Sequence, residues 1–276
     1  IANELGLDRL KYRRSSLQSD GAQLPTGQVL DDAGILSEAF DAIERKAPWA
    51  ELGIGPNRGV GVAACMWLTN PMPGSVTLKL NSDGTLGVLT AATENGSGAV
   101  ATGVRQIAAE EFGLSAEKVI VTMPDTDAAA FDAGSQGSRT THIVGRAVHE
   151  AAVQVRARIF ETAASLLEAA VEDLELADGA VVVVGTPTTR IPLADIAAAA
   201  QAAGGPISGS GSYTTPMPSV NPTCASGLLF PAFPTPTYHV HVAEVEVDPV
   251  TGGIRVLRYL VAQEVGRAIN PQAIRG

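Results

Sequence analysis

The chain has 276 residues, a formal net charge of -10 at pH 7 and a sequence pI near 4.9. Its length and 45% hydrophobic content predict one large core or two smaller ones. The acidic balance argues against a general nucleic-acid surface, which needs clustered Lys and Arg. No apolar stretch has the length of a membrane span, and no signal peptide is recognisable. Cys65 and Cys224 are too few for a disulfide framework, so we expect two free thiols and a cytoplasmic location. Charge and hydropathy together lead us to expect a soluble protein with neither nucleic-acid nor membrane partners.

The first sixty residues favour helices. Residues 1–17 place Leu side chains at amphipathic spacing ahead of a basic end, and residues 34–46 repeat apolar side chains at helical spacing. Residues 18–25 between them are polar. We expect 1–60 to be a helical segment that continues from an upstream domain, because the chain starts at Ile1 inside a helical pattern.

From residue 60 the hydrophobic period changes to about two, which predicts strands. Residues 60–67 read as one strand, and 76–80 and 86–90 read as a hairpin across a turn that ends in Gly84. A loop of small residues at 93–98 then opens a predicted helix at 100–112, which is followed by a predicted strand at 118–122.

A second loop of small residues, Gly134 to Thr141, opens a predicted helix at 143–170. Small side chains let backbone N–H groups approach a ligand, a helix start favours an anion, and Arg139 adds a fork of donors. An ordinary Ser/Thr helix cap is the alternative reading. The order strand, small-residue loop, helix thus occurs twice, and the two helix starts can converge on one ligand.

The remaining pattern predicts a strand at 181–184, a helix at 192–203 and a hairpin formed by 240–247 and 254–261. Residues 204–237 are dense in Gly, Pro and Ser without a period, so we expect a functional loop or one that wraps a neighbouring domain or subunit. The predicted fold is α+β, with mixed sheets, packed helices and repeated strand–loop–helix units. Its expected parts are a cofactor-loop domain at 61–203, a wrapping loop at 204–237, and a hairpin with the start of a truncated final domain at 238–276.

Other chemistry has weaker support. The four histidines, His142, His149, His239 and His241, lack the partners of a zinc set, so packing or solvent exposure is expected for them. Ser138 lacks the second glycine of a nucleophile elbow, which argues against a serine hydrolase. Asp125 and Asp127 suit either a magnesium ion or an Asx-rich turn.

Taken in order, the motifs of the chain resemble the large, molybdenum-cofactor-binding subunit of the xanthine dehydrogenase/aldehyde oxidase family. The resemblance runs over nearly the whole chain, and the order and spacing of its motifs make it specific. The matching segments are Leu5 to Asp8, Pro25 to Leu30, Thr93 to Gly98, Asp125 to Asp127, Gly134 to Thr141, His241 to Asp248 and Val265 to Pro271.

The resemblance implies a hydroxylase that inserts a water-derived oxygen at a carbon of an aldehyde or N-heterocycle. It implies molybdopterin, as mononucleotide or cytosine dinucleotide, held without protein metal ligands, and iron–sulfur clusters and FAD on partner subunits or domains. The small-molecule substrate and the remaining domains of the large subunit complete the expected partners. The alternative is a cofactor-free binding or assembly module that retains the fold.

The resemblance also assigns positions. Two groups match the family's cofactor loops, and one segment matches its substrate pocket. The first loop contributes Gly96, Ser97 and Gly98; the second contributes Gln136, Gly137, Ser138, Arg139 and Thr140; the pocket segment is Ala64, Cys65, Met66 and Trp67.

Several positions depart from the family pattern. Ser97 stands where the family commonly has Gln, and Ala64 where purine-oxidising members have Phe, which disfavours xanthine. The family's catalytic glutamate, in a Gly-x-Gly-Glu context, is expected beyond Gly276, and neither Glu94 nor Glu264 matches its motif. The segment alone is therefore expected to be inactive, with no cofactor bound tightly.

Overall fold

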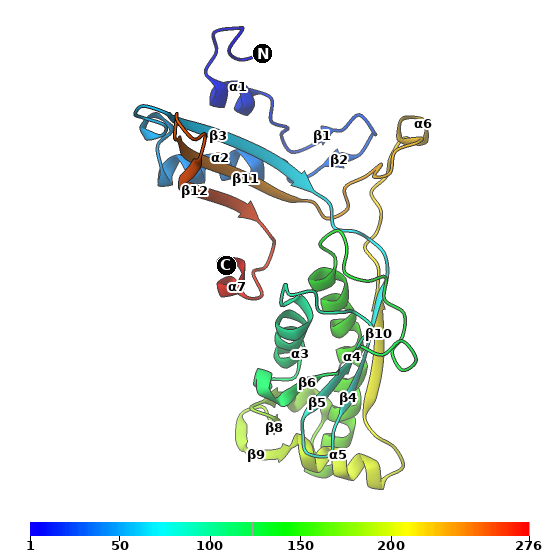
Figure 1. The fold of residues 1–276 in the computed structure, drawn as a ribbon. Helices are drawn as coiled ribbons and strands as arrows, with labels where there is room; N and C mark the ends of the chain where they lie inside the picture. Colours follow the sequence, from blue (N-terminus) through cyan, green and yellow to red (C-terminus); the bar gives the residue numbers. More distant parts are fainter. Residues whose placement is uncertain (123, 276) are drawn as a thin grey trace. The chain divides into compact units, whose positions relative to one another are not determined.

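The structure is a computed structural model that describes residues 1–122 and 124–275 (Figure 1). These residues divide into two compact units, each discontinuous in sequence. Unit 1 combines Ile1–Thr69 with Met217–Arg267, and unit 2 combines Asn70–Pro216 with Ala268–Gly276. The expected boundaries at 60, 203 and 237 do not coincide with these units, because the strand after residue 57 pairs with the strand that begins at Thr237.

Unit 1 is built on a three-stranded antiparallel sheet in the order β12-β11-β3. One face of this sheet packs against α2, where Phe40 and Ile43 meet Val240 and Val242 in a shared apolar cluster. The elements are α1 (Arg9–Ser15), β1 (Ala22–Gln23), β2 (Val29–Leu30), α2 (Ile35–Lys46), β3 (Arg58–Trp67), α6 (Pro222–Ala225), β11 (Thr237–Val247) and β12 (Ile254–Glu264). The predicted second helix, first strand and final hairpin are confirmed.

The first predicted helix is shorter than expected. It covers Arg9–Ser15 and leaves out residues 1–8. Gly6 has a φ of +63°, which a helix does not accommodate, and Asp8 caps the helix by accepting a hydrogen bond from Lys11 N at 2.8 Å. The basic end at Arg13 and Arg14 lies in the last turn, as predicted.

Unit 2 contains a four-stranded sheet in the order β10-β4-β5-β6, antiparallel except for the parallel pair β5 and β6, and a smaller antiparallel sheet β7-β8-β9. The long helix α4 packs against β10 and β4, and its apolar stripe forms the centre of the core (Figure 1). The elements are β4 (Gly74–Leu80), β5 (Leu86–Leu89), a π-helical turn (Ala99–Val104), α3 (Arg105–Glu111), β6 (Val119–Val121), α4 (Thr140–Leu167), β7 (Leu174–Ala177), β8 (Ala180–Val183), β9 (Thr186–Pro192), α5 (Leu193–Ala202), β10 (Ser208–Tyr213) and α7 (Pro271–Arg275). Both predicted strand–loop–helix units are present, whereas β7 and β9 were not predicted.

The expectation that residues 204–237 lack regular structure is wrong for Ser208–Tyr213. This segment forms β10 and pairs antiparallel with residues 74–79 of β4. Its glycines let the strand lie directly on α4, since a Cβ at Gly211 would stand 2.3 Å from Ala147 O and 2.5 Å from Ala151 N. The strand is therefore specified by close packing and not by alternating apolar side chains.

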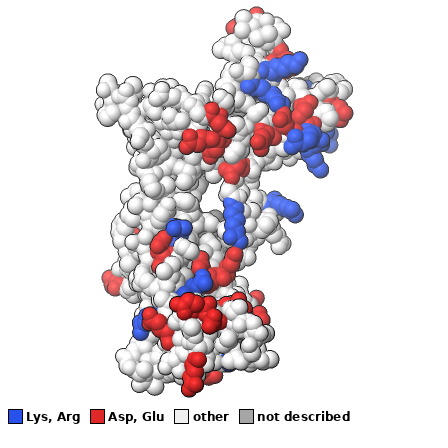
Figure 2. Space-filling view, turned by 180° about the vertical axis from the view of Figure 1, so that it is seen from behind, with Lys and Arg blue, Asp and Glu red and all other residues white. Residues whose placement is uncertain are grey.

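On the face drawn in Figure 2, acidic side chains break up the Lys and Arg residues, so no continuous basic patch is present there. Among the described residues, no helix combines the length and apolar character needed to cross a bilayer.

Candidate functional site

The structure brings the two small-residue loops together within unit 2. The first loop, residues 93–98, leads into the π-helical turn and α3, and the second loop, residues 134–141, leads into α4. Ser135 joins them, because its Oγ donates to Thr93 O at 3.1 Å and lies 3.0 Å from Thr140 Oγ1. The two helix starts are thus neighbours.

The first loop satisfies its own backbone. Six consecutive N–H groups, from Gly96 to Ala101, each donate to a side chain of the same loop. Glu94 accepts four of these hydrogen bonds, while Asn95 Oδ1 accepts from Ser97 N at 3.2 Å and Ser97 Oγ accepts from Ala99 N at 3.3 Å. The first loop therefore offers a ligand few free amides, contrary to the expectation of open donors at both helix starts.

The carboxylate of Glu94 is the centre of this arrangement. The hydrogen bond from Ala101 N–H, together with those from Gly98, Val100 and Gly96, holds the pKa of Glu94 below its ordinary value, although desolvation acts to raise it. A general base at neutral pH benefits from a raised carboxyl pKa, so this environment does not suit Glu94 for proton abstraction.

Arg139 of the second loop is fully buried. Its Nη1 donates to Asp132 Oδ1 at 2.9 Å and Gly134 O at 2.8 Å, and its Nε and Nη2 donate to Met72 O at 3.1 and 2.9 Å. The guanidinium therefore holds the loop and the segment before β4 together, and it does not present the fork of donors that the sequence suggested.

The start of α4 remains open. Its N-cap position is Arg139, and no side chain of the described residues makes a capping hydrogen bond there. Beside it, Gln136 and Ser138 are exposed, and Ser138 has a φ of +56°. Gly137 is required by packing, since a Cβ on it would lie 2.7 Å from Asn70 Cβ. The donors at the second loop are the first amides of α4, the Ser138 hydroxyl and Gln136 Nε2, which donates to Ala133 O at 3.2 Å within the loop.

The pocket segment Ala64 to Trp67 lies on β3 in unit 1. Successive side chains of a strand point to opposite faces, so the four cannot line one wall. Met66 is paired with Tyr238 and Ala64 with Val240; both partners are buried, and Val240 packs in the apolar cluster with α2. Cys65 and Trp67 share the other face of the sheet, where Trp67 is 50% exposed.

The open face of this sheet carries polar and aromatic side chains. Cys65 is paired with His239, whose Nε2 lies 2.9 Å from Thr237 Oγ1. His241 Nδ1 lies 3.0 Å from the hydroxyl of Tyr259. Cys65 is free and exposed, as is Cys224, which agrees with two unpaired thiols.

The remaining candidates take part in local structure. Asp125 Oδ1 accepts from Asp127 N at 2.9 Å, which is the Asx turn. His142 Nε2 bonds to Thr215 Oγ1 at 3.0 Å, and His149 Nδ1 lies 2.8 Å from Glu111 Oε1. Across the described residues, no group of three His, Cys, Asp or Glu side chains is arranged to hold a metal ion.

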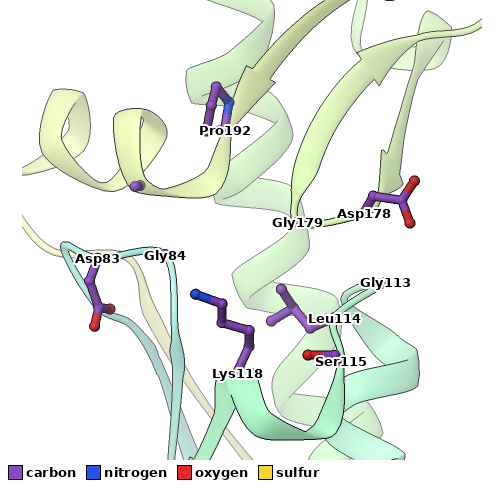
Figure 3. A pocket seen from close by; sticks show the side chains of 10 residues that line it. Asp83, Gly84, Gly113, Leu114, Ser115, Lys118, Asp178, Gly179 and Pro192 are labelled. Carbon is purple, nitrogen blue, oxygen red and sulfur yellow. The ribbon is translucent and has the colours of Figure 1, made fainter.

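A groove of about 510 Å³ lies elsewhere in unit 2. Figure 3 shows Lys118 pointing into it between the Asp83–Gly84 turn and Leu114. Its lining residues come from turns that include Gly113 and Gly179, and none belongs to either loop. The groove is therefore separate from the loop site.

Comparison with known proteins identifies the family. Residues 36–276 match the molybdopterin cofactor-binding domain. The chain belongs to this family. The molybdopterin family match confirms the relationship to xanthine dehydrogenase and aldehyde oxidase large subunits that the ordered motifs predicted.

Individual relatives of this molybdopterin-binding chain are distant but aligned along its full length. It is 30% identical to the 6-hydroxypseudooxynicotine dehydrogenase complex subunit gamma of Paenarthrobacter nicotinovorans, over 99% of the chain and 35% of the relative. It is 28% identical to the xanthine dehydrogenase molybdenum-binding subunit of Escherichia coli O157:H7, over 100% of the chain and 37% of the relative. The chain thus spans about a third of the length of these relatives.

The quinoline 2-oxidoreductase structure from Pseudomonas putida 86 superposes with a TM-score of 0.73 at 25% identity, covering 99% of this chain and 36% of the other. The predicted α+β fold is confirmed by this similarity.

Molybdopterin carries an anionic phosphate, so the loop that binds this phosphate must offer free hydrogen-bond donors. The uncapped start of α4, flanked by the exposed Gln136 and Ser138, fits an anionic group. The first loop does not, because its amides are already bonded to Glu94 and its neighbours. The sequence placed Glu94 within the first loop, but its hydrogen bonds to the loop amides were not predicted, although an acidic residue just before a helix start is a recognisable signal of favourable interaction with the helix N-terminus.

Proposed function

We propose that this chain contributes two cofactor loops and part of the substrate wall of a molybdenum hydroxylase that acts on an aldehyde or an N-heterocyclic carbon. The observation that carries the proposal is the junction of the two loops through Ser135, beside an α4 start that no described side chain caps. Family membership supports molybdopterin as the occupant of this site.

Different residues of the site have different roles toward the cofactor. The first amides of α4, including that of Thr140, and the side chains of Gln136 and Ser138 bind the anionic tail. Gly137 lets the loop approach Asn70, and Arg139 fixes the loop from inside. When bound, molybdopterin supplies the two-electron oxidation chemistry, with the metal held by its dithiolene.

Residues of the first loop act through shape and one hydroxyl. Ser97 Oγ accepts from Ala99 N, so its own proton is free to donate to the cofactor. Gly96 and Gly98 leave room on either side of Ser97. The substrate wall is formed by Cys65 and Trp67, because these two share the open face of the sheet.

The complete protein is proposed to work with iron–sulfur and FAD partners, as subunits or domains. The names of two relatives, a "complex subunit gamma" and a "large subunit", support a multi-subunit assembly. The two unpaired cysteines of this chain support a reducing, cytoplasmic location.

Metal and pterin analysis of the complete protein tests the proposal. We expect stoichiometric molybdenum and pterin, with the nucleotide released on hydrolysis identifying the cofactor form. Gln136→Ala should lower the cofactor content, whereas Gln154→Ala, on the body of α4 where its side chain bonds Ser210 O, should leave it unchanged. Absence of both molybdenum and pterin would reject the proposal in favour of a cofactor-free module.

A further inference from the structure

One side chain holds both ends of the first loop. Glu94 Oε1 accepts from the N–H groups of Gly96 and Gly98, each at 2.9 Å. Its Oε2 accepts from Val100 N at 3.1 Å and Ala101 N at 3.0 Å, inside the first helical turn. The carboxylate thus ties the turn that carries Ser97 to the helix that follows it.

We propose that Glu94 is a positioning residue of the molybdopterin site, which fixes the first loop so that Ser97 and the adjoining backbone carbonyls face the cofactor. This inference rests on the proposed function and adds to it a residue that does not itself touch the cofactor. Ser97 lies between Gly96 and Gly98, whose amides converge on one oxygen of Glu94, so the orientation of Ser97 depends on that oxygen.

The same arrangement determines what the first loop can bind. Its N–H donors from Gly96 to Ala101 are occupied, and an ionised carboxylate lies among them. A second anion at this loop would meet the charge of Glu94 without free amides to offset it. The first loop therefore takes uncharged or hydrogen-bond-donating groups, and anionic groups are directed to the open start of α4.

Hydrogen exchange combined with cofactor measurement, on the complete protein, tests this role. Glu94→Ala removes all four acceptor contacts, so exchange of the amides at 96, 98, 100 and 101 should accelerate by roughly tenfold or more. Glu94→Gln keeps one acceptor oxygen, so the exchange of only part of this set should accelerate. In both variants the cofactor should dissociate faster, by about tenfold for Glu94→Ala.

Asp248→Ala is the matched control. Asp248 also accepts two backbone amides in an exposed turn, from Val250 N at 2.8 Å and Thr251 N at 3.3 Å, but it belongs to the β11–β12 hairpin. Its loss should accelerate exchange in that turn alone and leave cofactor content and dissociation unchanged.

The possible results separate the alternatives. Faster exchange in Glu94→Ala with unchanged cofactor content and dissociation would overturn the positioning role and leave only a helix cap. Unchanged exchange would overturn the assignment of the four amides to Glu94. If Glu94→Ala does not fold, Glu94→Gln carries the same comparison. Wild-type protein without molybdenum or pterin would overturn the proposed function itself, a result distinct from equal loading of wild type and variants.

Discussion

Arg139 and Asp132 form an ion pair in which neither side chain has any solvent-exposed surface, with Nη1 2.9 Å from Oδ1. The other guanidinium donors bond the carbonyl groups of Met72 and Gly134. Gly74 packs so closely against this ion pair that its position has no room for a side chain, since a Cβ there would be 2.5 Å from Asp132 Oδ2. The second loop is thus anchored from within to the segment that enters β4.

Removal of one partner should strongly destabilise unit 2. Asp132→Ala leaves a buried guanidinium without its counter-charge, and we expect the free energy of unfolding to fall by about 3–5 kcal/mol. Urea unfolding of the chain measures this change. Asp127→Ala, at an exposed position of the preceding loop, should change stability by less than about 0.5 kcal/mol. Equal losses in the two variants would contradict a buried, paired Asp132.

Because β10 packs closely on α4, adding one methyl group at their contact should lower the stability of the fold substantially. Gly211→Ala would place a Cβ 2.3 Å from Ala147 O, so strand and helix must separate, at a cost of roughly 1–3 kcal/mol or more. Gly205→Ala is the control, because its Cβ would meet no atom within 4 Å. Thermal unfolding of both variants checks the difference, and a Gly211→Ala protein as stable as wild type would refute the contact.

His142 should make stability depend on pH. Partial desolvation of this exposed side chain, and secondarily the charge of Arg146, lower the pKa of His142 from the ordinary value of 6.5, so the folded state disfavours the protonated ring. The ring also bonds Thr215 and packs edge-on against Tyr213. The contribution of His142 is therefore complete above pH 6.5 and is lost as pH falls through the lowered pKa.

Denaturant titrations at pH 7.5 and pH 5 would measure this loss. His142→Asn, which keeps a polar group near Thr215, should reduce the difference in unfolding free energy between the two pH values. The prediction fails if the pH dependence of the variant equals that of wild type.

The alternation of side chains along β3 predicts which residues of the pocket segment affect substrate binding. In the complete enzyme, Trp67→Ala should raise KM by about tenfold, because it removes a large exposed aromatic surface from the open face of the sheet. Met66→Leu changes the opposite face and should leave KM near the wild-type value. Steady-state kinetics on the same substrate compares them; a larger effect from Met66→Leu would reverse the assignment of faces.

Elements with a clear hydrophobic period were predictable. The period of two located β4, β5, β11 and β12, helical spacing located α2 and α4, and a Pro-initiated, Ala-rich stretch located α5. In contrast, β10 reads Ser-Gly-Ser-Gly-Ser-Tyr, so no apolar alternation marks it. It becomes a strand because β4 offers hydrogen bonds and α4 requires glycine on the facing side, and both conditions come from tertiary structure.

The positions of the two small-residue loops in the fold were predictable, but the contacts of their side chains were not. Glycine and serine content located both loops, and chain order suggested that they converge. The direction of side chains was not accessible: Arg139 turns inward to Asp132, which stands seven residues before it, and Glu94 folds back onto the amides of its own loop. The sequence does not distinguish a charged side chain that binds a ligand from one that bonds the protein's own backbone, because both can stand next to small residues.

The discontinuity of the two units has a consequence for the order of folding. The β3–β11 pairing closes a very long stretch of intervening chain, and its entropic cost is high while unit 2 is disordered. Folding of unit 2 pairs Gly74 with Tyr213 and bonds Thr214 Oγ1 to Pro71 O, which brings the entry and exit of that stretch together. Unit 2 thus shortens the effective loop that unit 1 must close, so a mutation that unfolds unit 2 should also prevent the sheet bearing Cys65 and Trp67 from forming.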